Sequence, residues 1–354
     1  MSNLSIGIVG LPNVGKSTLF NALLGRQVAD ANNYPFCTID PNVGVVEVPD
    51  DKLPVLADIV KTDKIVPAIV EFVDIAGLVK GASTGEGLGN KFLTNIRDCD
   101  AICHVVRNFS DPSIIKEGSV DPQGDFEVIC AELIIKDLES LDKYLDTHKN
   151  NATEKNTKKY ALASKLKLAL EQGKLAVNLD LDEDEKVLLK EFFLLTAKPY
   201  FIVANVDENT YLNIDNFQTT LENIIPVCAK TEFELSELSF EDKINYLKEL
   251  GMTKSGLERV IQKAYETLGL QSFYTAGVKE VRAWTIPRSA RAPQAAGAIH
   301  TDFERGFIMA EIVSYQDFVA HQGWEGAKAQ GLLRHEGKDY QMRPDDVVEF
   351  RFNV

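Results

Sequence analysis

Short apolar runs recur along the first two thirds of the chain, and polar or mixed stretches separate them. The first run, residues 6–9, is rich in β-branched residues and passes into a glycine-containing loop at 10–17, which a helical pattern follows at 18–24. Five later runs have the length of buried strands, at residues 44–48, 69–73, 101–106, 200–204 and 225–227. Strands that alternate with helical or loop segments predict a mainly parallel sheet with helices on both faces.

The stretch between the strands at 101–106 and 200–204 is too long for a simple connection. Within it, apolar residues recur at steps of three and four over residues 131–145 and again over 162–169. This spacing predicts an inserted hairpin of two helices. Residues 136–174 carry nine lysines against six acidic residues, which is typical of a solvated helix face, with an RNA-facing arm as the alternative.

Beyond residue 270 the pattern changes to short strands at 278–286, 307–312 and 347–352, separated by turns rich in proline and glycine. This texture predicts a small α+β domain that serves as an interaction module. Arg282, Arg288, Arg291 and Trp284 could together hold a phosphate backbone and stack on a base. The alternative is that the arginines are ordinary surface residues of a strand and that Trp284 is a core residue.

The loop at 10–17 matches the phosphate-binding P-loop at every required position, between the strand and the helix that this motif needs. Its glycines let successive backbone N–H groups point at phosphate oxygens, and the helix N-terminus adds its positive dipole. Lys16 then reaches the terminal phosphates, and Ser17 binds Mg²⁺. The predicted nucleotide-binding residues of this loop are Asn13, Val14, Gly15, Lys16, Ser17 and Thr18.

Two further segments are typical of loops that close on a triphosphate. Thr38 precedes the second strand, where a threonine can bind Mg²⁺ and the γ-phosphate. Asp74 ends the strand at 69–73, where a carboxylate reaches Mg²⁺ through its hydration shell and the Gly77 amide senses the γ-phosphate. The predicted metal ligands are therefore Ser17, Thr38 and Asp74.

The residue that positions the attacking water is not assigned. Leu78 occupies the place where many GTPases carry a glutamine, and a leucine cannot orient water. His104 lies inside an apolar strand, which favours a packed residue. Asn13 faces the phosphates and is a candidate ligand for K⁺, with a turn-stabilising role as the alternative.

The segment after the strand at 200–204 occupies the place of the base-reading N-K-x-D motif of GTPases. Asn205 is retained, but Val206 replaces the lysine and Glu208 replaces the final aspartate. That aspartate accepts hydrogen bonds from two guanine donors that adenine lacks, and the longer side chain of Glu208 spoils this geometry. Cys228 and Ala229 resemble the short motif that closes over the base.

Composition and charge narrow the possible partners. The chain has 354 residues, 45% hydrophobic and 26% charged, as in soluble globular proteins. Its 38 Lys+Arg against 53 Asp+Glu give a net charge of −15, so we expect no DNA partner and only local RNA contacts. Five cysteines without a C-x-x-C pair indicate a reducing compartment. With no leader and no membrane-spanning run, we expect a cytoplasmic protein without a membrane partner.

Four motifs together resemble the YchF family of Obg-like ATPases, over nearly the whole chain. They are G-L-P-N-V-G-K-S at 10–17, D-I-A-G-L at 74–78, the altered N-x-x-E at 205–208 and H-T-D-F-E-R-G-F at 300–307. The resemblance implies a Ras-like P-loop nucleotide domain, an inserted helical arm and a C-terminal TGS domain of α+β, β-grasp shape. We place these domains at residues 1–125 with 196–270, at 126–195 and at 278–354.

The resemblance also implies ATP rather than GTP, and an association with ribosomes and translation. Some members carry a histidine in the loop after the strand at 101–106, but residues 107–125 contain none. The sequence therefore predicts a Mg²⁺-dependent P-loop ATPase that acts as a slow switch on the ribosome or ribosomal RNA and binds GTP more weakly. The alternatives are a GTPase of the same class and a nucleotide-stabilised RNA or ribosome adaptor with incidental hydrolysis.

Overall fold

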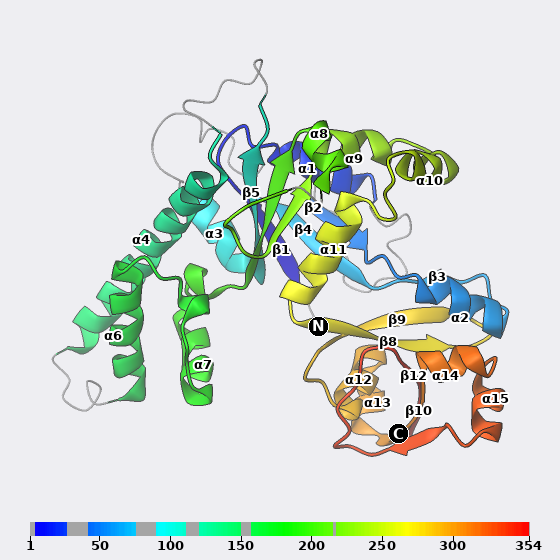
Figure 1. The fold of residues 1–354 in the computed structure, drawn as a ribbon. Helices are drawn as coiled ribbons and strands as arrows, with labels where there is room; N and C mark the ends of the chain where they lie inside the picture. Colours follow the sequence, from blue (N-terminus) through cyan, green and yellow to red (C-terminus); the bar gives the residue numbers. More distant parts are fainter. Residues whose placement is uncertain are drawn as a thin grey trace.

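The computed structural model describes residues 4–26, 42–75, 90–110, 120–149, 157–214 and 217–353. Its first sheet has the strand order β2–β4–β1–β5–β6–β7 (Figure 1). β2 runs antiparallel to β4, and the other neighbours are parallel. All six strands predicted for this region are confirmed, and so is the α/β fold class. The strands are β1 (Ser5–Val9), β2 (Val43–Glu47), β4 (Ile69–Asp74), β5 (Ala101–Asn108), β6 (Tyr200–Val206) and β7 (Ile224–Val227).

Helices cover both faces of this sheet. α1 (Lys16–Leu24) and α11 (Gly256–Thr267) pack on one face, and α3 (Asn90–Asp98) and the first half of α4 (Pro122–His148) pack on the other. The sequence of α11 explains its position, since its buried apolar residues recur at steps of three and four. Further helices follow the last two strands: α8 (Glu208–Leu212), α9 (Ala229–Ser236) and α10 (Phe240–Glu249).

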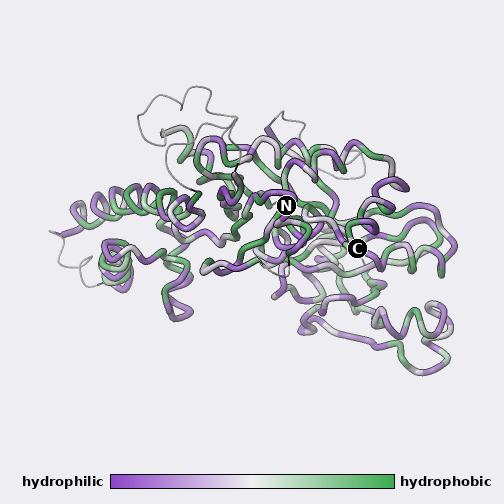
Figure 2. Tube along the Cα trace, turned by 45° about the horizontal axis from the view of Figure 1, so that its top comes forward, coloured by the Kyte–Doolittle hydropathy of each residue, from purple (hydrophilic) through white to green (hydrophobic). Residues whose placement is uncertain are grey.

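The predicted helical hairpin is confirmed as an arm beside the first sheet. α4 and α6 (Lys158–Glu171) pack against each other and share a separate apolar core with α7 (Glu183–Leu189). Hydrophobic and hydrophilic residues alternate along these helices (Figure 2), as amphipathic packing requires. At the base of the arm, the buried carboxylate of Asp137 accepts hydrogen bonds from the Leu195 N–H (2.9 Å) and from the Thr196 N–H (2.8 Å) and hydroxyl (2.6 Å).

Acidic residues of the arm compensate the positive charge of residues 136–174. Lysines of α6 form ion pairs with acidic side chains of α7 and of the residues just after it: Lys158 with Asp184, Lys165 with Glu185 and Lys159 with Glu191. These partners lie beyond residue 174, so the charge excess of the shorter window overstates the positive charge of the surface. The solvated helix face is therefore the favoured interpretation.

A second sheet is formed mainly by the C-terminal part of the chain, with the order β11–β10–β12–β8–β9–β3. β8 and β9 form an antiparallel hairpin, and β8 pairs in parallel with β12, which is the arrangement of a β-grasp domain. Its strands are β3 (Ile65–Val66), β8 (Leu270–Ala276), β9 (Val281–Pro287), β10 (Phe307–Ser314), β11 (Arg334–Glu336) and β12 (Asp346–Phe352). Its helices are α12 (Ala292–Ile299), α13 (Thr301–Arg305), α14 (Tyr315–Ala320) and α15 (Trp324–Ala329).

Three strands of the second sheet were not predicted: β3, β8 and β11, the last of only three residues. β8 does not appear as an apolar run because it contains the polar residues Gln271 and Ser272. Both have hydrogen-bond partners in the structure: Gln271 donates to the Met342 carbonyl (2.8 Å), and the Ser272 hydroxyl hydrogen-bonds with the hydroxyl of Tyr265 (2.8 Å). β3 has only two residues and belongs by sequence to the first half of the chain. The predicted domain limits stay predictions.

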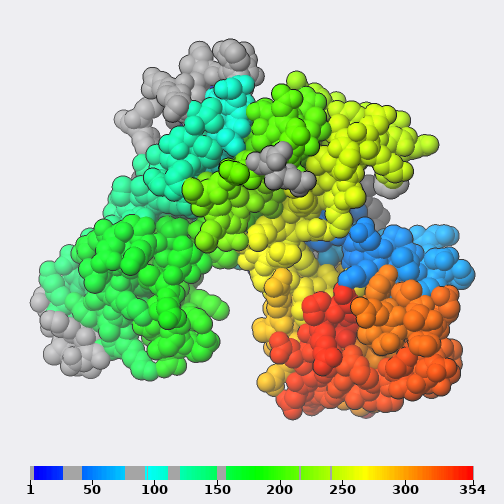
Figure 3. Space-filling view, viewed as in Figure 1, coloured from blue at the N-terminus to red at the C-terminus, as the bar shows by residue number. Residues whose placement is uncertain are grey.

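The arm and the second sheet form two lobes that stand apart, with the first sheet above them in the view of Figure 3. Within the described parts of the chain, no helix has the length and apolar character that crossing a membrane requires.

Candidate functional site

The loop between β1 and α1 makes a tight turn that two residues permit. Gly15 has a φ of 97°, and a Cβ at this position would lie 2.1 Å from Nδ2 of Asn205. Asn13 has a φ of 62°, in the left-handed region that asparagine tolerates better than most residues. This backbone geometry supports the turn-stabilising role of Asn13. The loop delivers Lys16 as the first residue of α1.

Lys16 is a buried cation at the carboxyl edge of the sheet, with 8% of its surface exposed. Its Nζ donates to the Leu11 carbonyl at 2.7 Å. Burial lowers the pKa of Lys16, and the nearby carboxylate of Asp74, itself buried at the end of β4, partly counteracts this. A poorly solvated ammonium gains most from an anionic partner, and a phosphate is such a partner.

Asn205, at the end of β6, joins two loops through one side-chain amide. Its Nδ2 donates to the Val14 carbonyl at 2.9 Å, and its Oδ1 accepts from the Ala229 N–H at 3.0 Å. Asn205 therefore holds the P-loop against the first turn of α9. The side chain of Val14 is fully buried in the core, so Val14 faces this region only through its backbone.

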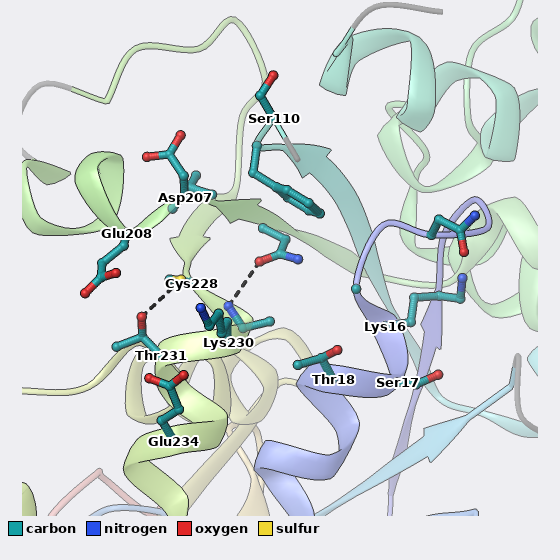
Figure 4. Close-up of a pocket in the computed structure, with 16 residues that line it drawn as sticks. Lys16, Ser17, Thr18, Ser110, Asp207, Glu208, Cys228, Lys230, Thr231 and Glu234 are labelled. Atoms are coloured by element: carbon teal, nitrogen blue, oxygen red, sulfur yellow. Dashed lines mark hydrogen bonds between the residues drawn. The ribbon is translucent and has the colours of Figure 1, made fainter. Parts of the chain in front are cut away.

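A cavity of about 620 Å³ opens between these loops (Figure 4). The structure brings together at its wall most of the nucleotide-binding residues predicted from the sequence. They are Asn13, Gly15, Lys16, Ser17, Thr18, Asn205, Val206, Glu208, Cys228 and Ala229. Their roles in binding stay predictions, and the predicted Thr38, Gly77 and Leu78 lie outside the described residues.

Other residues that line the cavity were not assigned from the sequence. Among them, Asp207 accepts from the Thr210 N–H at 2.8 Å and so caps α8. One oxygen of the Asp207 carboxylate is engaged in this cap. Glu208 is the exposed first residue of the same helix. The remaining unassigned residues are Phe109, Ser110, Lys230, Thr231 and Glu234.

Phe109 is held in place by an arginine beneath the cavity wall. Arg107, only 3% exposed, donates from Nε to the Phe109 carbonyl at 3.1 Å, and its guanidinium carbon lies 4.6 Å from the ring centroid. Ligands of open α/β sheets bind beyond the carboxyl ends of the strands. The position of Phe109 just after β5 was therefore a signal in the sequence that could have indicated it.

His104 is confirmed as a packed residue. Its ring lies 4.9 Å from that of Phe126 and 5.6 Å from that of Tyr200, measured between centroids. Burial lowers the pKa of His104 to about 3, so its imidazole is neutral at pH 7. It does not line the cavity described above.

Comparisons with known proteins place this site in context. A family model described as "50S ribosome-binding GTPase" matches residues 5–139, and a YchF GTPase C-terminal model, described as "Protein of unknown function (DUF933)", matches residues 270–353. The chain is 49% identical to the ribosome-binding ATPase YchF of Bacillus subtilis over 365 residues, covering 99% of this chain and 100% of the relative. It is 49% identical to the protein of the same name from Escherichia coli O157:H7 over 359 residues, covering 98% and 99%. The solved structure of the Schizosaccharomyces pombe YchF GTPase superposes with a TM-score of 0.90 at 38% identity, covering 99% of this chain and 98% of that one.

Proposed function

Because the chain belongs to the YchF family, we propose that it is a Mg²⁺-dependent nucleoside triphosphatase that hydrolyses ATP to ADP and phosphate and acts as a slow switch on ribosomes. The observation that carries the proposal is the buried ammonium of Lys16, which lines a 620 Å³ cavity and has the Asp74 carboxylate nearby. The bacterial relatives are named ATPases and the solved structure is named a GTPase. The identity of the base is therefore the first point to test.

The described residues fit a Mg²⁺ ion that is bound together with phosphate. Mg²⁺ usually takes one or two protein oxygens and completes its shell with phosphate oxygens and water. Ser17, in the first turn of α1, and Asp74, at the end of β4, supply such a set. No group of three or more Asp, Glu, His or Cys residues that could hold a metal ion occurs in the part of the chain that the structure describes. Thr38 as a third ligand and K⁺ at Asn13 stay predictions.

We expect ATP to bind more tightly than GTP, and the substitution Glu208→Asp to move this ratio toward GTP. The shorter carboxylate can restore the two-acceptor geometry that guanine needs, which is worth about 1–3 kcal/mol, or roughly 5- to 150-fold in the ratio of dissociation constants. Competition binding of ATP against GTP measures both values. Glu237→Asp, an exposed residue beyond the end of α9, is the matched control. Tighter binding of GTP by the unmodified protein would make the GTPase alternative the better one.

Ribosomes should stimulate the hydrolysis of ATP by this protein. The printed names of the relatives motivate this expectation, since a switch uses its partner to set the lifetime of the triphosphate state. Single-turnover hydrolysis with and without purified ribosomes is the measurement, and cosedimentation in ATP and in ADP accompanies it. Equal rates together with equal binding in both nucleotide states would favour the adaptor with incidental hydrolysis.

A further inference from the structure

Residues 48–68 connect β2 to β4, yet they pack on the second sheet. The chain leaves the first sheet at its edge strand, forms α2 (Lys52–Val60) and β3, and returns along the strand that ends in Asp74. In Figure 1 this blue segment lies beside β8, β9 and α14. We call residues 48–68 the connecting segment.

The backbone of the connecting segment extends the second sheet. β3 pairs in parallel with β9, with Ile65 opposite Val281 and Val66 opposite Arg282. The Val281 N–H also donates to the Lys64 carbonyl at 2.9 Å. α2 packs against β8, β9 and α14, and its Leu53, Leu56 and Ala57 belong to one apolar core that contains buried residues of both sheets.

Three polar contacts reinforce this packing. The Tyr274 hydroxyl donates to the Asp50 carboxylate at 2.7 Å. Lys52 forms an ion pair with Asp345, and both side chains are partly shielded from water. Lys64 pairs with Glu280 at 2.7 Å. Each of these contacts joins the connecting segment to a residue of the second sheet or its loops that lies more than 200 positions later in the chain.

A cavity borders the connecting segment on the side that faces α10 and α11. This cavity of about 440 Å³ separates Pro49, Leu53 and Ile65 from the end of α1 and from α10 and α11. A water molecule occupies about 30 Å³ in the liquid, so this space is large compared with single bound waters. The connecting segment also contacts the far side of this cavity, because Gln262 of α11 donates to the Pro49 carbonyl at 3.5 Å and Lys254 lies 3.5 Å from Asp51. It therefore bridges the second sheet and the helices that cover the first sheet.

The second sheet is also attached to the first through α11, which packs against β8 and whose Tyr265 hydroxyl hydrogen-bonds with Ser272 and Thr285. α11 ends at Thr267 and β8 begins at Leu270, so the covalent junction is brief. The Arg288 N–H donates to the Gly269 carbonyl at 2.9 Å across this junction. Because the second sheet contacts both α11 and the connecting segment, its orientation relative to the first sheet depends on both contacts.

We propose that the connecting segment couples the nucleotide bound at the Lys16 cavity to the orientation of the second sheet. In this proposal, a change at Asp74 displaces β4, and the displacement passes through β2, β3 and α2 to the second sheet. The orientation of the second sheet toward its macromolecular partner then changes. This inference rests on the proposed function, because it needs two nucleotide states.

Hydrogen–deuterium exchange on the full chain tests the coupling. We expect peptides that cover residues 48–68 and 277–287, including the Val281 amide, to exchange at rates that differ about fivefold or more between ADP and a non-hydrolysable ATP analogue. This corresponds to the lower end of typical coupling between two sites. Equal exchange in both states, with both nucleotides shown to bind, would overturn the inference and leave the proposed function intact. Failure of either nucleotide to bind would overturn both.

A double variant, Lys52→Ala with Tyr274→Phe, tests whether these contacts carry the coupling. It should still bind nucleotide, lose most of the exchange difference at 277–287, and change the ratio of the dissociation constants for ADP and the analogue, because coupling is reciprocal. Arg351→Ala, which removes an ion pair with Glu311 within the second sheet, is the matched control. If the double variant melts early, Lys52→Ala with Lys64→Ala replaces it. An unchanged exchange difference in the variant would contradict the proposed route.

Discussion

Replacing Lys16 with alanine should abolish tight nucleotide binding and reduce turnover by a factor of about 10² or more, the cost of removing one preorganised donor from a water-poor site. Lys16 is the buried cation of the P-loop, and its ammonium is positioned to reach the β- and γ-phosphates. Its ammonium donates to the Leu11 carbonyl and also interacts with the buried Asp74 carboxylate. Asp74 loses this neighbouring cation in the alanine variant, so we expect a variant that folds but is less stable.

Isothermal titration with ATP and a single-turnover assay measure the two effects, and a thermal melt without nucleotide checks the fold. Lys248→Ala, an exposed lysine of α10, is the matched control and should leave both binding and turnover unchanged. Turnover at the wild-type rate in the Lys16 variant would disprove the assignment of the P-loop as the phosphate site.

The substitution Asn205→Ala should weaken ATP and GTP binding together and leave their ratio nearly unchanged. It removes the partners of the Val14 carbonyl and the Ala229 N–H at once. Each buried polar group left without a partner costs about 1–3 kcal/mol, so a combined loss of affinity on the order of 10²-fold follows. The P-loop and the first turn of α9 would then no longer be held together.

Equilibrium binding of both nucleotides is the measurement. Asn205→Asp separates the two bonds, because it retains the acceptor for Ala229 and loses the donor for Val14. Asn213→Ala, which removes only a local exposed hydrogen bond to Asn209, is the control. A large change in the ratio of ATP to GTP affinity would show that Asn205 contacts the base directly, and would contradict the positioning role.

The first sheet could be predicted because its strands are buried on both faces and appear as continuous apolar runs. The P-loop could be predicted because phosphate binding needs a fixed spacing of glycines and lysine. The second sheet was harder to predict from the sequence. β8 contains polar residues whose partners lie far away in the sequence. β3 joins a sheet whose other strands begin about 200 residues later, a distance at which local patterns carry no information.

The candidate site shows the same division. The motif residues at the cavity wall were found from the sequence, but Phe109 and Glu234 belong to no motif and are brought there by strand order alone. The sequence predicted that Asn205 belongs to the motif that reads the nucleotide base. Its two hydrogen bonds to separate loops depend on a contact between residues that are far apart in sequence. The compensation of the positive charge at residues 136–174 likewise depends on residues outside that window, because Glu185 and Glu191 pair with lysines of α6.

α4 is one continuous helix that runs from the first sheet into the arm. One end of this 27-residue helix lies beside the cavity, where Asp125 accepts the backbone N–H of Arg107, the residue that holds Phe109. The other end reaches the tip of the arm. The first half of α4 packs on the first sheet and Asp137 is anchored by Leu195 and Thr196, so the turns beyond Asp137 form the part that extends into the arm. At about 1.5 Å per residue these turns span roughly 17 Å, and a tilt of about 10° at Asp137 would displace the tip by about 3 Å.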